Sequence, residues 1–136
     1  MSCNKNFVWN FPTDFLSICD FSSNTEVVGL DLDYQKITEL KEYSFTSFES
    51  LESLSLAKNE LATIQNKAFN GLDQLTFLVL AYNNVSLIEP GAFDDLVSTK
   101  NIFLQGNPYL NSLTTKYVSC FIILQMLQTT ITIRVK

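Results

Sequence analysis

The sequence predicts an α/β-type repeat solenoid with short parallel β-strands on a concave face and irregular or short helical segments on the convex side. The main observation is an internal repeat. Residues 51–74, LESLSLAKNELATIQNKAFNGLDQ, are followed without a gap by residues 75–98, LTFLVLAYNNVSLIEPGAFDDLVS, and the two match column by column over 24 residues. The same period covers 27–50 and a partial fourth unit, 99–109. A unit of this size cannot bury its apolar face alone, so the units must stack.

Six columns of the repeat are apolar, at positions 4, 6, 11, 14, 19 and 22 of each unit. Positions 4 and 6 give the alternation L-x-L, which is typical of a short strand whose leucine side chains point inward. Position 11 runs from Ile37 in the first unit to Tyr109 in the fourth. We expect each column to line one edge of a common core. Position 19 is always phenylalanine, namely Phe45, Phe69 and Phe93.

Position 9 holds a polar amide among these apolar columns, in the form of Asn59, Asn83 and Asn107. An amide at this place makes sense only if it satisfies backbone donors and acceptors inside a turn. Gln35 occupies the position in the first unit, where its greater length predicts a looser turn. Thr99 replaces the aliphatic residue at position 1 of the fourth unit, and we expect the stack to weaken there.

These columns spell L-x-x-L-x-L-x-x-N-x-L, and residues 27 to about 109 resemble the leucine-rich repeat family. A 24-residue unit with phenylalanine at position 19 is similar to the extracellular subclass found in Toll-like receptors, insect leucine-rich immune proteins and matrix proteoglycans. The resemblance implies an extracellular or secreted recognition module of innate immunity, whose concave face binds another protein or a pathogen-derived ligand. The alternatives are a structural matrix or scaffold protein, a self-associating repeat fragment without a dedicated ligand, and an intracellular adaptor.

We expect the two ends to differ from the repeats. Residues 1–26 resemble the N-terminal cap of extracellular members, which implies a disulfide between Cys3 and Cys19; two free, buried cysteines are the alternative. Residues 110–136 are either an atypical C-terminal cap, with a helix through Ile122, Ile123, Met126 and Leu127, or the truncated tail of a longer repeat protein.

Three features of the ends bear on location. Cys120 has no obvious partner within the chain. The tail that contains it is too short and too polar for a membrane span, which needs about 20 mostly apolar residues. Met1 is followed at once by Ser-Cys-Asn-Lys-Asn-Phe, without the apolar stretch of a secretory signal, so a secreted protein would need a leader that this sequence does not contain.

Composition excludes several classes of function. Histidine is absent, which removes His-based catalytic triads and imidazole metal ligands. Fourteen acidic and nine basic side chains give a net charge of −5, the wrong sign for nucleic-acid binding. No glycine-rich phosphate-binding motif occurs. We therefore expect no enzyme activity, no cofactor, no metal and no nucleic-acid partner.

Positions 2, 3, 5, 7 and 8 are expected on the concave face, including Ala57 and Ala81 at position 7. An apolar and aromatic group on neighbouring strands there would suit a binding hot spot. The alternative is that the C-terminal tail or a second copy of the chain, in a homo-oligomer, covers this group. The ligand-binding candidates are Tyr34 and Lys58 together with the apolar group itself, Phe77, Val79, Tyr82 and Phe103.

The sequence contains one N-x-S/T sequon, Asn84-Val85-Ser86. Asn84 directly follows the expected buried Asn83, so its side chain should face solvent. The position predicts an N-linked glycan if the protein is secreted.

Overall fold

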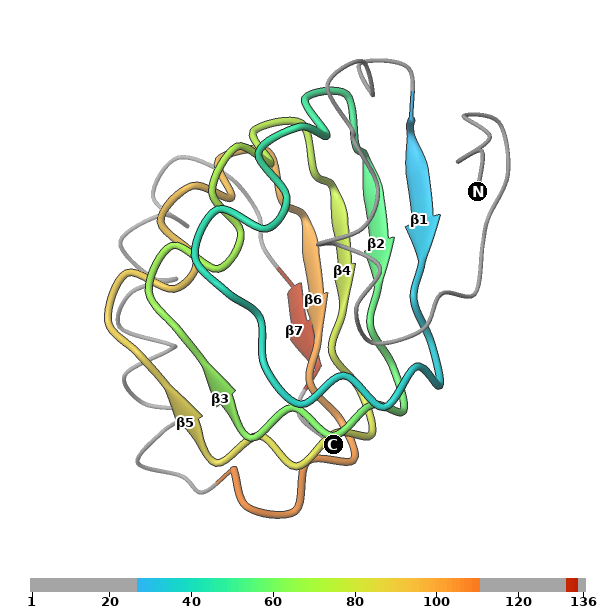
Figure 1. The fold of residues 1–136 in the computed structure, drawn as a ribbon, viewed down its shortest axis with the longest axis vertical. Coiled ribbons are helices and arrows are strands. Elements are labelled where there is room, and N and C mark those ends of the chain that lie inside the picture. Colours follow the sequence, from blue (N-terminus) through green and yellow to red (C-terminus); the bar gives the residue numbers. More distant parts are fainter. Residues whose placement is uncertain (1–26, 111–131, 135–136) are drawn as a thin grey trace.

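The computed structural model describes residues 27–110 and the backbone of residues 132–134. A larger sheet and a smaller sheet, each of parallel strands, make up this part of the chain (Figure 1). The larger sheet contains, in spatial order, β1 (Gly29–Asp31), β2 (Ser53–Ser55), β4 (Phe77–Val79), β6 (Asn101–Phe103) and β7 (Thr132–Arg134). The smaller sheet pairs β3 (Thr63–Ile64) with β5 (Leu87–Ile88).

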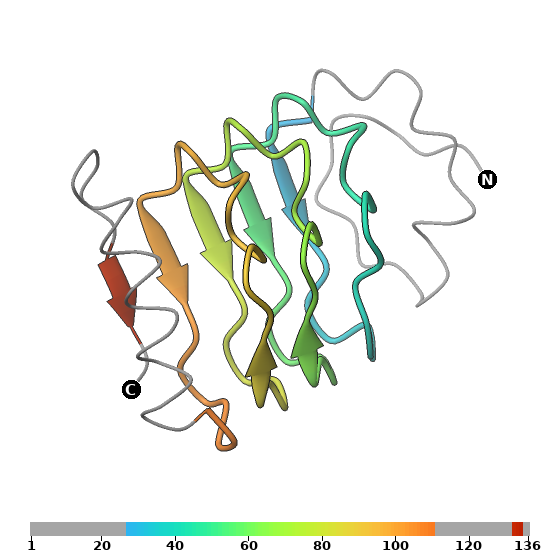
Figure 2. The same ribbon diagram turned by 90° about the vertical axis from the view of Figure 1, so that its left-hand side faces the viewer.

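The strand register follows the 24-residue period of the sequence. Leu30, Leu54, Leu78 and Ile102, all at position 4, lie opposite one another across β1, β2, β4 and β6. Figure 2 shows the strands of each sheet side by side along the stack. The predicted fold class is confirmed, with turns and the smaller sheet forming the returning segments; no helix occurs in the described part of the chain.

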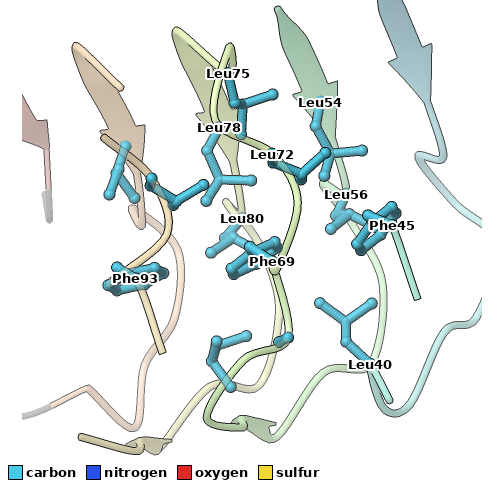
Figure 3. Packing of buried hydrophobic residues seen from close by; sticks show 14 of the residues in the cluster. Leu40, Phe45, Leu54, Leu56, Phe69, Leu72, Leu75, Leu78, Leu80 and Phe93 are labelled. Atoms are coloured by element: carbon cyan, nitrogen blue, oxygen red, sulfur yellow. The ribbon is translucent and has the colours of Figure 1, made fainter. Parts of the chain in front are cut away.

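The core lies between the larger sheet and the returning segments. Leucines at positions 4 and 6 approach it from the strands, and the phenylalanines of position 19 approach it from the opposite side (Figure 3). The Phe69 ring is fully buried and stacks between two others, with centroid distances of 6.2 Å to Phe45 and 5.9 Å to Phe93. These rings form a continuous row through three units, which we call the phenylalanine row.

The asparagines of position 9 are buried and join neighbouring units. Asn59 Oδ1 accepts hydrogen bonds from the backbone N–H groups of Gln35 and Ile37, at 2.9 and 3.0 Å, in the preceding unit. Asn59 Nδ2 donates to the carbonyl oxygens of Leu32 and Leu56, both at 2.9 Å. Each such amide therefore fastens its own turn to the previous one. Among the described residues, the side chain of Gln35 in the first unit donates within its own turn, to the carbonyl of Asp33.

Two expectations about the fourth unit are wrong. Thr99 does not weaken the stack, because it is fully buried and its hydroxyl donates to the carbonyl of Leu75 at 2.8 Å, which satisfies the polar group inside the core. Tyr109 does not continue the apolar column of position 11, since its side chain is 63% exposed. A tyrosine ring is larger than the aliphatic side chains of that column, and its hydroxyl would need a partner if buried.

The sheet continues beyond the fourth unit. Strand β7 pairs in parallel with β6, and Ile133 lies opposite Ile102 at the place that position 4 takes in the other strands. The separation is 31 residues, against 24 between the other paired strands. The predicted N-terminal cap with Cys3 and Cys19, the predicted C-terminal helix and Cys120 lie outside the described residues.

Candidate functional site

The candidate site is the face of the larger sheet that points away from the core, which we call the open face. Along β4 the alternation is clear, because Leu78 is buried while Phe77 is 45% exposed and Val79 is half-buried. The register places Val79 opposite Phe103 on β6, which is also half-buried. The structure therefore brings Phe77, Val79 and Phe103 together on two neighbouring strands.

The expectation that position 7 belongs to the accessible face is wrong for the second and third units. Ala57 and Ala81 are only 7% and 2% exposed, so neither offers surface to a partner. In the first unit, Asp33 takes this position, and its Oδ1 accepts hydrogen bonds from Ser55 Oγ at 2.6 Å and from the backbone N–H of Ala57 at 2.8 Å. Asp33 therefore links the first two units, a structural role that its charge alone did not reveal.

Position 8 forms a row at the edge of the open face, and all four units adopt a left-handed backbone there. The φ angles are 60° at Tyr34, 56° at Lys58, 57° at Tyr82 and 74° at Gly106. Left-handed φ is unfavourable for residues with a Cβ atom. The turns that the asparagines of position 9 hold nevertheless impose it on two tyrosines and a lysine, and so place their side chains next to one another.

The side chains of this row interact. Lys58 Nζ donates a hydrogen bond to the Tyr34 hydroxyl. The same ammonium lies 4.6 Å from the ring centre of Tyr34 and 5.9 Å from that of Tyr82, within the range of cation–π attraction. The hydrogen bond to Tyr34 is the main reason that the pKa of Lys58 is raised above its ordinary value. The row thus presents two tyrosines that flank a charged lysine.

Gly106 should accommodate a side chain poorly, because a Cβ there would collide with the ring of Tyr82, which would have to move. We expect Gly106→Ala to lower the free energy of unfolding by about 1–2 kcal/mol, since the left-handed conformation is also strained for alanine. Urea denaturation measures this change. Gly29→Ala is the matched control, because nothing lies within 4 Å of its added Cβ, and it should be close to neutral. Equal losses in the two variants would contradict the steric argument.

The open face is polar on both sides of its apolar centre. Glu52 is exposed at position 2 beside β2, and Lys100 is exposed at position 2 beside β6. Thr76 lies between them, since its N–H donates to the carbonyl of Glu52 at 2.8 Å and its carbonyl accepts from the N–H of Lys100 at 2.9 Å. Acidic and basic side chains therefore occupy opposite flanks of β4.

Other kinds of site find no support in the described part of the chain. Residues 27–110 contain no group of three or more acidic or cysteine side chains that could hold a metal ion. Within the same residues, no helix is long and apolar enough to cross a membrane. Asn84 is exposed, as expected for a glycan acceptor, while Asn83 next to it is buried.

The comparison with known families decides the class of protein. The family model for leucine rich repeats matches residues 25–85 and 56–108, which together make up more than half of the chain. The chain belongs to the leucine-rich repeat family. No curated protein matches this leucine-rich repeat chain.

Among solved structures, the chain is similar to that of the TLR13–ssRNA13 complex, with 24% sequence identity and a TM-score of 0.50. The match covers 71% of this chain but 16% of the receptor chain. The predicted resemblance to Toll-like receptor repeats is therefore confirmed for the fold. Because this leucine-rich repeat chain spans only a small part of that receptor, the similarity carries no activity with it.

Proposed function

We propose that this leucine-rich repeat domain binds another protein through its open face. The observation that carries the proposal is the exposure of two aromatic side chains there, 45% for Phe77 and 56% for Tyr82. Aromatic residues, and tyrosine in particular, are enriched at the centres of protein interfaces, where they supply much of the binding energy. The half-buried Val79 and Phe103 extend the same apolar surface onto the next strand.

Side chains of the open face are also held in place before a partner binds. Parallel strands fix the spacing of Phe77 and Val79 relative to β6, and Lys58 orients Tyr34 through a hydrogen bond. Side chains that are already in place lose less conformational entropy when a partner binds. The face is therefore a rigid surface onto which a partner can dock.

We further propose that the partner is met outside the cell, in an innate-immune setting, as the resemblance to Toll-like and insect immune repeats implies. The exposed Asn84 supports this part, because a sequon asparagine must be accessible to carry a glycan. Peptide mass spectrometry of the protein from its native source should find a glycan on Asn84 and a bridge between Cys3 and Cys19. A bare Asn84 together with two free thiols would argue for an intracellular adaptor.

Two other functions, nucleic-acid binding and catalysis, are not proposed. The solved neighbour is a complex with single-stranded RNA, but this chain has a net charge of −5. A chain of this net charge repels the phosphate backbone, and the two lysines of the open face, Lys58 and Lys100, are offset by Asp31 and Glu52. Catalysis is not proposed either, because residues 27–110 hold no histidine or cysteine that could act as a nucleophile or general base.

Phe77→Asp should abolish partner binding without unfolding the domain. A charge at the centre of an apolar interface is strongly unfavourable, so recovery of partners should fall more than about tenfold. The measurement is affinity capture from the extracellular fluid of the source organism, with the immobilised wild-type chain and the variant compared side by side. Leu87→Asp is the matched control, because Leu87 is 50% exposed but lies in β5, on the smaller sheet. Proteins retained equally by Phe77→Asp and the wild type would refute binding through the open face.

A further inference from the structure

The charged and aromatic side chains of the open face are arranged in a way that is compatible with a two-fold axis. Strand β4 is the middle strand of the larger sheet, with two strands on each side of it. At position 2, one flank carries the exposed Glu52 and the other the exposed Lys100. Two exposed aromatic residues, Phe77 and Tyr82, belong to the central unit between the flanks. At position 2, an acidic and a basic side chain therefore lie on either side of a central unit with two exposed aromatic rings.

Consider a second copy placed face to face with the first by a two-fold axis that runs along β4. The rotation reverses the order of the strands, so β2 of one copy lies over β6 of the other. Because neighbouring strands share one register, position 2 meets position 2, and Glu52 faces Lys100 of the second copy at both ends of the interface. Stacked sheets pack about 10 Å apart with their strands within about 30°, a gap that extended glutamate and lysine side chains can bridge.

The other positions of β2 and β6 are complementary in size as well. At position 5, the small Ser55 would face the large Phe103, and at position 8, Lys58 would face Gly106. At position 3, the two polar residues Ser53 and Asn101 would meet. Each pair joins a small side chain to a larger one, or two groups that can form a hydrogen bond, so no like charges are opposed.

We propose that the open face pairs with a second copy of this chain, in a two-fold dimer that has Phe77 and Tyr82 at its centre and Glu52–Lys100 ion pairs on both flanks. This inference rests on the proposed function, because it identifies the partner of the same face. A foreign partner would have to match an acidic and a basic flank at once, whereas a second copy matches both by symmetry. Alternating charges of this kind favour one orientation and exclude others.

The decisive experiment is a charge reversal with rescue, measured by sedimentation velocity of the full chain over a range of micromolar concentrations. The wild type should form a species of twice the 15.4 kDa chain mass. Glu52→Lys and Lys100→Glu should each raise the dimer dissociation constant by about tenfold or more, because each creates two like-charge contacts. The double variant should recover wild-type dimerisation to within about threefold, since its ion pairs are restored with reversed polarity.

Two charge reversals at sites away from the open face serve as matched controls. Lys36→Glu and Glu60→Lys change the same charges at exposed sites of position 10, and neither should affect the dimer. A wild-type chain that stays monomeric, or a double variant that stays as weak as the single ones, would overturn self-pairing. The two proposals fail separately. A monomeric wild type whose captured proteins are lost in Phe77→Asp would refute self-pairing alone, whereas captured proteins that Phe77→Asp retains would refute the proposed function.

Discussion

Replacing Asn83 with alanine should lower the free energy of unfolding by about 2–4 kcal/mol, a large loss for so small a stack. Asn83 Oδ1 accepts from the backbone N–H of Leu61 at 3.1 Å, and its Nδ2 donates to the carbonyl oxygens of Leu56 and Leu80 at 2.9 and 3.1 Å. Alanine would leave the N–H of Leu61 without this acceptor inside the core. The two carbonyls would lose one donor each but keep a second one, Asn59 Nδ2 for Leu56 and Asn107 Nδ2 for Leu80. The cost is thus that of one unsatisfied backbone N–H together with two further lost hydrogen bonds.

The neighbouring asparagine supplies the control for this variant. Asn84 is exposed, and within the described part of the chain its side chain forms no hydrogen bond to another unit, so Asn84→Ala should change stability by less than about 0.5 kcal/mol. Urea denaturation followed by far-ultraviolet circular dichroism compares the two. If Asn83→Ala is as stable as Asn84→Ala, the turns are held by packing alone and the asparagine side chains of position 9 do not stabilise the stack.

The repeat itself could be predicted because it is written in residue types at fixed spacing. Positions 4 and 6 are apolar in every unit, and a short strand with these side chains pointing inward accounts for the alternation. A polar Asn59 or Asn83 among apolar columns indicated a buried amide with backbone partners, and the structure places it so. Periodicity is a strong signal because several units carry the same information.

The features that escaped prediction depend on backbone geometry that side-chain type does not encode. At position 8, only Gly106 is a residue type that favours left-handed φ, since tyrosine and lysine rarely adopt it. The backbone is also left-handed at position 17, which is Tyr43, Lys67 and Gly91 in the three full units. The row in which Lys58 lies against Tyr34 and Tyr82 follows from these turns, so the sequence indicated its members but not their contacts.

The fourth unit shows a second limit of column matching. Thr99 was judged by its polarity, but a threonine whose hydroxyl finds a carbonyl oxygen packs much as an aliphatic residue does. Strand β7 escaped for a different reason, because its spacing from β6 is not the spacing of the repeat. Residue types predict burial at a repeat position well only where the 24-residue period is kept. The prediction also requires that the hydrogen-bond partner of each polar side chain can be foreseen.

Phe69→Ala should lower the free energy of unfolding by about 3–5 kcal/mol, the usual cost of removing a buried phenylalanine ring. Phe69 is fully buried and is the middle member of the phenylalanine row, so both Phe45 and Phe93 would lose a stacked neighbour. The cavity would lie between units. In a solenoid the contact between neighbouring units supplies much of the stability, and the loss should therefore also reduce the cooperativity of unfolding.

Phe77→Ala removes the same side chain from the open face, where it is 45% exposed, and should cost less than about 1 kcal/mol. Urea titrations of both variants measure the midpoint and the slope of the transition. A lower midpoint with a shallower slope for Phe69→Ala alone is expected, because a weakened contact lets the units on either side unfold separately. Equal losses in the two variants would mean that the strand leucines, and not the phenylalanine row, hold the stack together.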